Sequence, residues 1–519
     1  MNWKRPLAIT LAAATFGTTL AACGAPADSG AQASSTPAAQ AQNLSNEAVK
    51  APKYVFLFIG DGMSYPQIQS TADYLGALED ADYWQAEPSL DDNGGAVLDG
   101  PSYLNFMNFE AAGSAVTYDS NSFCPDSAST ATSISTGHKT YSGTINMDET
   151  GTTAYETIAE KVHDQLGMQV GVISSVNLNH ATPAAFYAHQ ASRNDYYEIG
   201  LELVESGFEY FAGGGLLKPT GAEGDQADLY TLAEEAGYNV VKTQAEAEQV
   251  TEGPVVIVDE HLADGDAMAY ELDRTDDMWA LADYVEKGIE VLDNDKGFFM
   301  MCEGGKIDWA CHANDAASSI HDTKALADAV QVAIDFAEDH PDETLILVTG
   351  DHETGGLTIG FAGTDYDTYL NLLESQKISF AKYDSDYVAA YKENKTSFED
   401  VLADIETLFG LKTEGEEGDK LVLTPYELSQ LKTAYEKSIN ETATGMDEQQ
   451  EYVMYGTYEP LTVTITHILN NKSGVSFTSY SHTGLPVAVL AHGLNAEQFN
   501  GYYDNTEIFN KLADMLSVQ

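Results

Sequence analysis

Short runs of apolar residues recur along this chain of 519 residues. Five of them predict buried strands, because strands that are covered on both faces of a parallel sheet are apolar throughout. They are Val55–Ile59, Val170–Ser174, Val255–Val258, Phe298–Met301 and Thr344–Val348. Amphipathic helical stretches such as Thr323–Ala337 lie between some of these runs. The alternation predicts an α/β fold, a three-layer sandwich in which helices cover both faces of a central, mostly parallel sheet.

The pattern changes between about residues 363 and 459. This segment is rich in Tyr, Glu, Lys and Thr, and it contains the acidic loop Glu414–Asp419. We interpret it as an inserted lobe, since apolar sequence typical of a core resumes at Leu461–Leu469 and Leu485–Leu490. The sequence therefore predicts one large α/β unit over residues 51–519 that carries this insertion.

The first residues have the features of an export signal. Two basic residues precede the apolar run Leu7–Ala22, which is too short to span a membrane and predicts a signal peptide over residues 1–22. The run ends in a sequence that resembles a bacterial lipoprotein cleavage box, which predicts a lipid on Cys23; ordinary cleavage is the alternative. Gly24, rather than Asp, favours sorting to the outer membrane over retention elsewhere. Residues 23–50 are rich in Ala, Ser, Gln and Pro and predict a flexible tether.

Acidic residues strongly outnumber basic ones: 82 Asp and Glu against 24 Lys and Arg give a net charge of −58. This charge argues against nucleic acid as a partner. It is typical of a heavily solvated surface, as in proteins from salty media, so we expect screening salt to be needed for full stability. After Cys23 the chain has three more cysteines, Cys124, Cys302 and Cys311, and three thiols cannot all pair. We expect them to be small buried thiols.

Carboxylate and imidazole side chains follow three of the predicted strands. Asp61 comes directly after the first strand, which ends in glycine. In open α/β sheets the chemistry lies at the carboxyl ends of strands, and a carboxylate there is a natural ligand for a hard metal ion. Glu303 follows a second strand, and Asp351 with His352 follows a third. We expect a metal site at this edge of the sheet.

A second set of candidate ligands lies on a helix. Asp308 and His312 are four residues apart, which places them on one face of a helix, and a carboxylate and an imidazole at that spacing suit zinc. A pair on the helix surface is the alternative. His482 comes just before a late apolar segment, and its position alone does not decide between a ligand and an ordinary histidine.

Ser127 lies where a tight turn leads into a short predicted helix. The dipole at such a helix start favours an anion, either a phosphate or a serine alkoxide; a plain N-cap is the alternative. Arg193 is one of only three arginines, and it follows the segment Asn177–Ala184, which contains His180 and Thr182. A guanidinium suits bidentate contact with a phosphoryl group, whereas a salt bridge to one of the many carboxylates is the alternative.

Together these segments resemble the alkaline phosphatase family. The matching segments, in the family's order, are Phe58–Met63, Asp126–Ala128, His180–Ala184, Glu303–His312, Thr349–Gly356 and His482–Gly484. They extend over nearly all of the chain after the tether, and the ordered set is far more specific than any single segment. The long gap between His352 and His482 is similar to that of bacterial members with a large inserted crown lobe.

The resemblance implies two zinc ions and one magnesium ion. By similarity the first zinc is held by Asp308, His312 and His482, the second zinc by Asp61, Asp351 and His352, and the magnesium by Asp61, Thr182 and Glu303. The resemblance also implies that Ser127 is the nucleophile, that a phosphoserine forms there, and that Arg193 binds the phosphate. The implied substrates are small phosphate monoesters. Dimerisation is an expectation from the family alone.

Two positions differ within the family. His180 occupies a position that is Asp in some members, and Trp309 one that is Lys or His in others. We hypothesise that the lack of a cation at Trp309 weakens the retention of phosphate. His180 leaves open whether the third metal position holds magnesium firmly or accepts zinc.

Three other functions compete with this interpretation. A sulfatase would need a Cys or Ser that is oxidised within a Cys/Ser-x-Pro-x-Arg sequence, which Cys124–Ser127 does not provide. Phosphodiesterases of the same fold usually lack the third metal set and the phosphate-binding arginine, whereas Thr182, Glu303 and Arg193 are all present here. A tethered solute-binding lipoprotein would need no nucleophile.

Overall fold

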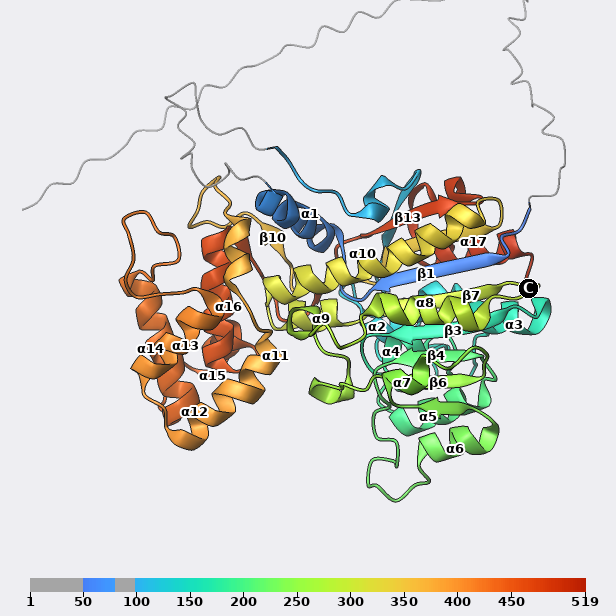
Figure 1. Cartoon of the computed structure of the whole chain (residues 1–519), viewed down its shortest axis with the longest axis horizontal. Coiled ribbons are helices and arrows are strands. Elements are labelled where there is room, and N and C mark those ends of the chain that lie inside the picture. The colour runs from blue at the N-terminus through green and yellow to red at the C-terminus, as the bar shows by residue number, and fades with distance from the viewer. Residues whose placement is uncertain (1–49, 80–98) are drawn as a thin grey trace, which may run out of the picture. The chain divides into compact units, whose positions relative to one another are not determined.

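The computed structural model describes residues 50–79 and 99–519 of the chain (Figure 1). The predicted signal peptide (residues 1–22), Cys23 and all but the last residue of the predicted tether (residues 23–50) lie outside the described residues. Within the described ranges, none of the helices is long and apolar enough to span a bilayer.

A ten-stranded sheet forms the centre of the molecule, with the strand order β14-β2-β13-β8-β1-β7-β3-β4-β6-β5. Its strands are β1 (Tyr54–Gly60), β2 (Ala111–Val116), β3 (Gln169–Ser174), β4 (Tyr210–Gly213), β5 (Asn239–Val241), β6 (Val255–Val258), β7 (Phe298–Gly304), β8 (Thr344–Gly350), β13 (Val487–Gly493) and β14 (Gly501–Asp504). β13 runs antiparallel to β8 and β2, and the other neighbouring pairs are parallel. The prediction of a mostly parallel α/β sheet is confirmed.

Two further two-stranded sheets lie beside the main one. They pair β9 (Glu353–Thr354) with β12 (His482–Thr483), and β10 (Thr358–Ile359) with β11 (Val475–Ser476). The first pair matters for function, because it brings His482 next to the segment that follows β8.

Helices cover both faces of the main sheet, as predicted (Figure 1). They are α1 (Tyr65–Glu79), α2 (Ser127–Thr136), α3 (Ile158–Leu166), α4 (Ala181–Ala184), α5 (Tyr196–Glu205), α6 (Leu229–Ala236), α7 (Gln244–Ala247), α8 (Leu281–Leu292), α9 (Lys306–His312), α10 (Ala316–Asp339) and α17 (Thr506–Leu516). Short 3-10 turns connect them at η1 (Asn105–Asn108), η2 (Asp264–Asp266), η3 (Glu271–Asp273) and η6 (Ala496–Phe499).

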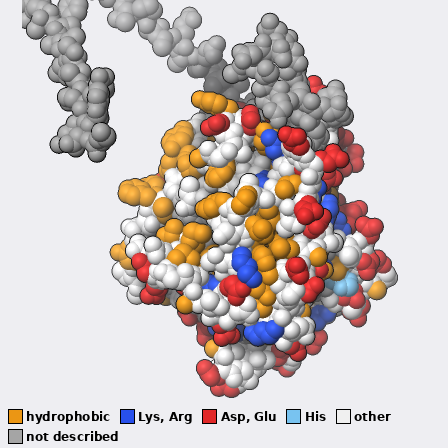
Figure 2. Space-filling view, turned by 90° about the vertical axis from the view of Figure 1, so that its left-hand side faces the viewer, with side chains coloured by type: hydrophobic (Ala, Val, Ile, Leu, Met, Phe, Trp, Pro, Cys, Tyr) orange, Lys and Arg blue, Asp and Glu red, His pale blue; other side chains and the backbone are white. Residues whose placement is uncertain are grey.

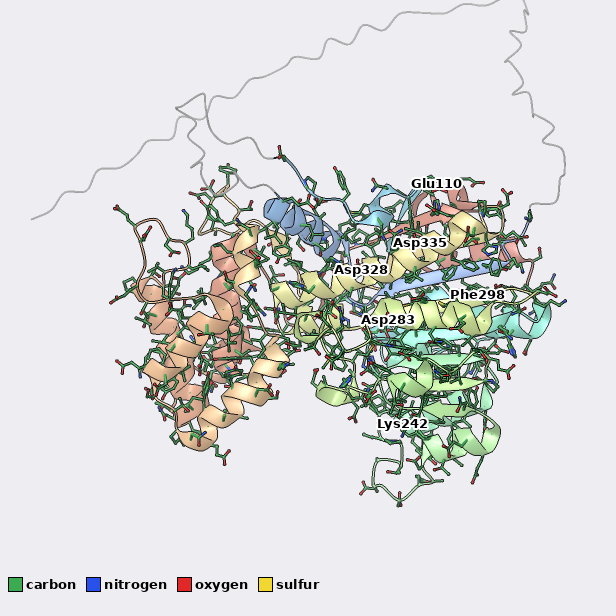
Figure 3. The ribbon with its side chains drawn as sticks, in the orientation of Figure 1. Glu110, Lys242, Asp283, Phe298, Asp328 and Asp335 are labelled. Carbon is green, nitrogen blue, oxygen red and sulfur yellow. The ribbon has the colours of Figure 1, made fainter. Side chains whose placement is uncertain are left out.

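Strand β1 shows why the sequences of the predicted strands are continuous runs of apolar residues. Its side chains alternate between two cores: Val55, Leu57 and Ile59 pack in the cluster that includes α2 and α17. Phe56 and Phe58 pack on the other face, in the cluster that includes α8 and α10. Both faces are therefore buried, and no polar side chain is needed along the strand. Phe298 at the start of β7, labelled in Figure 3, is fully buried in the same way.

The segment that the sequence sets apart is helical. We call residues 370–473 the helical lobe; it contains η4 (Leu370–Ser375), α11 (Phe380–Tyr383), the π-helical turn η5 (Asp384–Val388), α12 (Ala389–Asn394), α13 (Phe398–Phe409), α14 (Pro425–Asn440), α15 (Glu448–Tyr455) and α16 (Pro460–Ser473). Leu461 and Leu469 pack with Leu431 and Ile439 in an apolar cluster that also takes in side chains of α1 and α10. The apolar sequence at Leu461–Leu469 thus belongs to the core of the lobe rather than to the sheet.

Acidic side chains crowd the surface, in keeping with the net charge. On α10, Asp328 and Asp335 are both exposed and lie seven residues apart, on one side of the helix (Figure 3). Asp328 pairs with Lys324 at 2.6 Å. Figure 2 shows one face of the molecule, where red acidic side chains are frequent toward the edges and blue basic ones are few.

The cysteines differ from the prediction at one position. Cys302 and Cys311 are buried free thiols, as expected, but Cys124 is exposed. The prediction of a buried thiol is therefore wrong for Cys124, because the loop that precedes α2 lies at the surface, where Phe123 is also 85% exposed.

Candidate active site

Three central strands end in glycine at the same level of the sheet. Gly60 of β1 lies in register with Gly304 of β7 and Gly350 of β8. A side chain at Gly350 could not be accommodated, because its Cβ would lie 1.9 Å from the carbonyl oxygen of Met63, where the chain turns after β1. The residues that follow these strands therefore meet at one edge of the sheet, the edge where α/β proteins bind ligands.

The first group of candidate ligands consists of Asp308, His312 and His482, whose ligand atoms lie within 4.8 Å of one another. Asp308 and His312 stand one turn apart on α9, and His312 Nε2 lies 3.3 Å from Asp308 Oδ2. His482 reaches the same point from β12, with Nε2 at 3.1 Å from His312 Nε2.

Backbone carbonyls fix the orientation of both imidazoles. His312 Nδ1 donates to the Tyr480 carbonyl and His482 Nδ1 donates to the Pro125 carbonyl, each at 2.6 Å. The two Nε2 atoms are left as acceptors that face each other, so a proton or a cation between them is needed. This is the arrangement that orients histidines as metal ligands.

The second group consists of Asp61, Asp351 and His352, all fully buried. His352 Nε2 lies 3.4 Å from Asp61 Oδ1 and 3.3 Å from Asp351 Oδ2. Asp351 is held by the backbone N–H groups of Gly62 and His352, which donate to its Oδ1 at 3.1 and 2.9 Å. Both carboxylate oxygens of Asp61, in contrast, have no hydrogen-bond partner.

The third group brings Asp61 and Glu303 together with His180. Thr182 Oγ1, Glu303 Oε1 and His180 Nδ1 are buried and have no hydrogen-bond partner. Glu303 Oε2 accepts a hydrogen bond from Ser174. His180, which the sequence placed beside the third metal position, contributes a ligand atom to this group itself.

The buried carboxyl groups at this edge need either protons or bound cations to neutralise them. Burial raises the pKa of Glu303 to about 8, and burial together with Asp308 raises that of Asp351 to about 7. Burial, with the charges of Asp351 and Asp308, also raises the pKa of Asp61 well above its usual value. Burying an ionised carboxylate without a partner costs several kcal/mol of folding free energy, and ligation of a metal ion offsets a cost of about this size. The orphaned oxygens and the converging imidazoles thus fit bound divalent metal ions.

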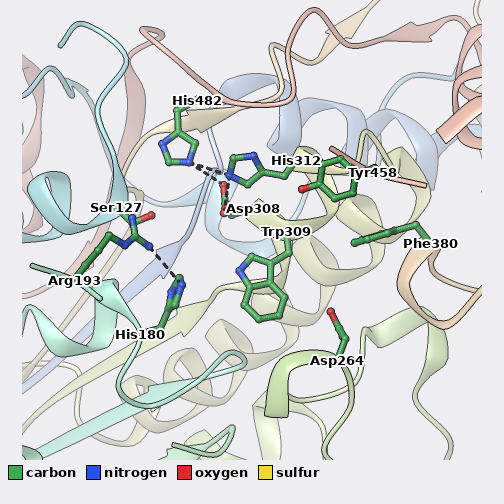
Figure 4. A pocket seen from close by; sticks show the side chains of 10 residues that line it. All are labelled: Ser127, His180, Arg193, Asp264, Asp308, Trp309, His312, Phe380, Tyr458 and His482. Carbon is green, nitrogen blue, oxygen red and sulfur yellow. Dashed lines mark hydrogen bonds and ion pairs between the residues drawn. The ribbon is translucent and has the colours of Figure 1, made fainter. Parts of the chain in front are cut away.

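Ser127 stands at the first turn of α2, with Asp126 as N-cap. Its Oγ lies 3.1 Å from His352 Nε2, so it adjoins the second group. Arg193 lies on the same side of the cavity as Ser127 (Figure 4). Its Nη1 donates to Asp126 Oδ2 at 2.8 Å, and its Nη2 lies 3.4 Å from His180 Nε2. Arg193 therefore forms the salt bridge that was the alternative, and it also lines the cavity; its contact with a phosphoryl group stays a prediction.

A cavity of about 410 Å³ lies beside these residues (Figure 4). Its lining includes Ser127, His180, Arg193, Asp308, Trp309, His312 and His482 from the predicted set. It also includes Asp264, Phe380 and Tyr458, which the sequence did not indicate. Phe380 and Tyr458 belong to the helical lobe and carry no local motif; only their place in an inserted segment could have drawn attention to them.

An α/β sheet with clustered carboxylates and imidazoles at its carboxyl edge is typical of metal-dependent hydrolases. The sequence profile of the alkaline phosphatase family matches residues 52–518. Alkaline phosphatase 3 of Bacillus subtilis strain 168 is 30% identical over 488 residues, which is 91% of each chain. The chain therefore belongs to the alkaline phosphatase family, and it is a phosphomonoesterase.

Solved structures agree with this assignment. A cold-active alkaline phosphatase from the psychrophile Shewanella sp. has a TM-score of 0.68 at 28% identity, over 89% of this chain and 99% of that chain. The alkaline phosphatase of Thermus thermophilus has a TM-score of 0.72 at 21% identity, over 93% of this chain and 96% of that one. The second likeness supports the fold alone.

Proposed function

We propose that the protein hydrolyses phosphate monoesters through a phosphoserine at Ser127, with two zinc ions and one magnesium ion as cofactors. The observation that carries this proposal is that Ser127, Arg193, the first ligand group and His180 of the third line one cavity. The second ligand group adjoins this cavity, with His352 Nε2 at 3.1 Å from Ser127 Oγ. A phosphodiesterase of the same fold or a binding protein would not need this combination.

The donor atoms suggest which ion each group would hold. Asp308, His312 and His482 form a carboxylate and imidazole set that suits zinc, as do Asp61, Asp351 and His352. Asp61, Thr182 and Glu303 offer the oxygen atoms that suit magnesium, and His180 adds a nitrogen beside them. When bound, these ions would supply positive charge that stabilises phosphoryl oxygens and lowers the pKa of the serine hydroxyl.

The chain's own residues then account for the reaction. Ser127 Oγ attacks phosphorus, the bond between phosphorus and the leaving oxygen breaks, and the hydroxyl proton ends on the released alcohol. Arg193, which Asp126 holds in place, binds the phosphoryl oxygens during the transfer. Water then cleaves the phosphoserine, which restores the hydroxyl of Ser127 and releases inorganic phosphate.

Release of p-nitrophenol from p-nitrophenyl phosphate tests the proposal, with zinc and magnesium supplied. We expect Ser127→Ala to lower kcat by at least about a hundredfold, because the phosphoryl acceptor is lost. Ser133→Ala is the matched control, since Ser133 Oγ bonds only within α2, to the Ser129 carbonyl. Mass spectrometry after acid quenching should find a phosphoryl group on Ser127. Undiminished turnover by Ser127→Ala would contradict the proposal.

The same assay separates the rival functions. Faster hydrolysis of bis(p-nitrophenyl) phosphate than of the monoester would favour a phosphodiesterase. The absence of turnover with either ester would favour a solute-binding protein. Metal analysis of the purified enzyme by mass spectrometry tests the proposed ratio of two zinc ions to one magnesium ion.

We also propose that the protein is exported, anchored to the outer membrane through a lipid on Cys23, and dimeric. The support comes from the N-terminal sequence and, for the dimer, from the family. Partition of the full chain into detergent, compared with Cys23→Ala, tests the anchor. Light scattering of the purified protein gives the oligomeric state.

A further inference from the structure

One side of the active-site cavity is aromatic and has no role in the steps above. Figure 4 shows Ser127 and Arg193 on one side, Phe380 and Tyr458 on the other, and Trp309 between them. Phe380 and Tyr458 are partly exposed and come from the helical lobe, whereas Trp309 comes from α9. We call Trp309, Phe380 and Tyr458 the aromatic wall.

The position of Phe380 is fixed by hydrogen bonds from the lobe to the α/β part. Its backbone N–H donates to Asp315 Oδ2 at 2.9 Å, and Asp315 is fully buried at the start of α10. The neighbouring Ser379 N–H donates to Asp273 Oδ1 at 2.9 Å. The ring of Phe380 then meets that of Tyr458 edge to face, with centroids 5.9 Å apart at 83°. These contacts hold the two rings in place before any ligand arrives.

Trp309 is also held from several sides. The Lys306 ammonium lies 4.6 Å from the centre of its ring, and His180 packs against it at 6.0 Å. Gly265 lies next to Trp309, since a Cβ there would be 3.5 Å from the edge of the indole. The Lys306 side chain is fully buried and pairs with Asp264 at 2.7 Å, which offsets the charge of the carboxylate that lines the cavity. The aromatic wall is therefore rigid and close to a neutral ion pair.

We infer that the aromatic wall binds the leaving group and favours phosphate monoesters of aromatic alcohols. This inference rests on the proposed function. In phosphoryl transfer the attacking and leaving oxygens lie in line, so the leaving group points away from Ser127. A cavity of about 410 Å³ is in the range of those that hold small organic ligands, with room beyond the phosphoryl group. An aromatic ring that makes offset or edge contacts with the aromatic wall should bind more tightly than an aliphatic ring of similar size.

Two esters that differ only in the aromaticity of the ring test the inference: benzyl phosphate and cyclohexylmethyl phosphate. We expect the wild-type enzyme to favour benzyl phosphate in kcat/KM by roughly three- to tenfold, the gain typical of an aromatic contact. Phe380→Leu and Tyr458→Leu should each lower this ratio to below about two, since they replace a ring by an apolar side chain. Inhibition by inorganic phosphate should not change in either variant, because the phosphate side of the cavity is intact.

Tyr426→Leu is the matched control, since Tyr426 is a 72% exposed aromatic residue of the same lobe. In this variant the ratio of kcat/KM for benzyl phosphate to kcat/KM for cyclohexylmethyl phosphate should equal that of the wild type. Equal kcat/KM for the two esters in the wild type would overturn the inference and leave the proposed function standing. Variants that lose activity toward both esters by the same factor would also overturn it, because they would show a structural role. No phosphate release from either ester would overturn the proposed function and the inference with it.

Discussion

The two carboxylate oxygens of Asp126 have different partners, which allows one of its roles to be removed alone. Asp126 Oδ1 accepts from the backbone N–H groups of Ser129 and Gly143, at 3.1 and 2.9 Å, and so caps α2. Oδ2 accepts from Arg193 Nη1 at 2.8 Å. In Asp126→Asn the amide oxygen can still cap the helix that carries Ser127, but an N–H group faces the guanidinium. The substitution should therefore disturb Arg193 and spare the fold.

The energy at stake can be estimated from the geometry. The side chains of Asp126 and Arg193 are 20% and 21% exposed. Burial raises the pKa of Asp126, but the charge of Arg193 and the Gly143 amide together outweigh burial and bring the pKa below its usual value. A hydrogen bond between charged groups contributes about 1.5–3 kcal/mol. The loss in Asp126→Asn is smaller than this, because the variant no longer has to bury the charge of the carboxylate. With about 1.4 kcal/mol per tenfold in affinity, we expect the Ki for inorganic phosphate to rise about five- to thirtyfold.

The assay is competitive inhibition of p-nitrophenyl phosphate hydrolysis by inorganic phosphate, at fixed zinc and magnesium. Asp228→Asn is the matched control, because Asp228 also caps a helix, accepting from the Thr231 N–H at 3.0 Å, but lies outside the cavity. Its Ki should equal that of the wild type. An unchanged Ki in Asp126→Asn would refute the reasoning, as would an equal rise in both variants.

Three further predictions concern pH, phosphate and salt. Burial lowers the pKa of His189, but the opposing effect of Glu160 and Glu202 is larger, and the pKa rises from 6.5 to about 10. The protonated imidazole therefore stabilises the fold fully below about pH 6.5, and this stabilisation is lost as the pH rises through about 10. His189→Gln should thus lower the melting temperature at about pH 7 but hardly at about pH 11, and an equal loss at both would contradict this. Trp309→Lys should lower the Ki for inorganic phosphate by adding a cation to the cavity, and an unchanged Ki would count against the hypothesis. The melting temperature should rise with NaCl, because salt screens the net charge of −58; no rise would refute a need for salt.

The strands that the sequence predicts best are those whose side chains are buried on both faces of the sheet. Val255–Val258 coincides with β6, and Val55–Ile59 lies within β1, because burial on both faces leaves only apolar side chains. The prediction for β7 stops at Met301, although the strand continues to Gly304. The difference arises at Glu303, a fully buried carboxylate within the strand. In the sequence a polar residue such as Glu303 marks the end of an apolar run. In the structure Glu303 is still part of the strand, and its carboxylate belongs to the third group of candidate metal ligands.

Other strands were not predicted because their residues are small rather than apolar. β2 has the sequence AAGSAV, in which a glycine and a serine lie between alanines. Its place beside β13 is set by pairing over a long distance in the chain, which no local pattern shows. The aromatic wall escaped prediction for a similar reason, since Phe380 and Tyr458 are two among 19 Phe and 29 Tyr residues. Motifs indicate chemistry that needs particular residue types, whereas a binding wall needs only a ring in the right place.

The electrostatics of the cavity also constrain the order in which its ligands bind. Among the described residues that line it, Arg193 is the one with a guanidinium or ammonium group, and it already pairs with Asp126. Asp308 lines the cavity, and the buried carboxylates of Asp61 and Asp351 lie in the adjoining ligand group. A phosphate dianion brought next to these carboxyl groups would be repelled by each one that is ionised, in a region of low dielectric constant. Phosphate affinity should therefore depend on metal occupancy, because the bound cations change the sign of the local field from negative to positive.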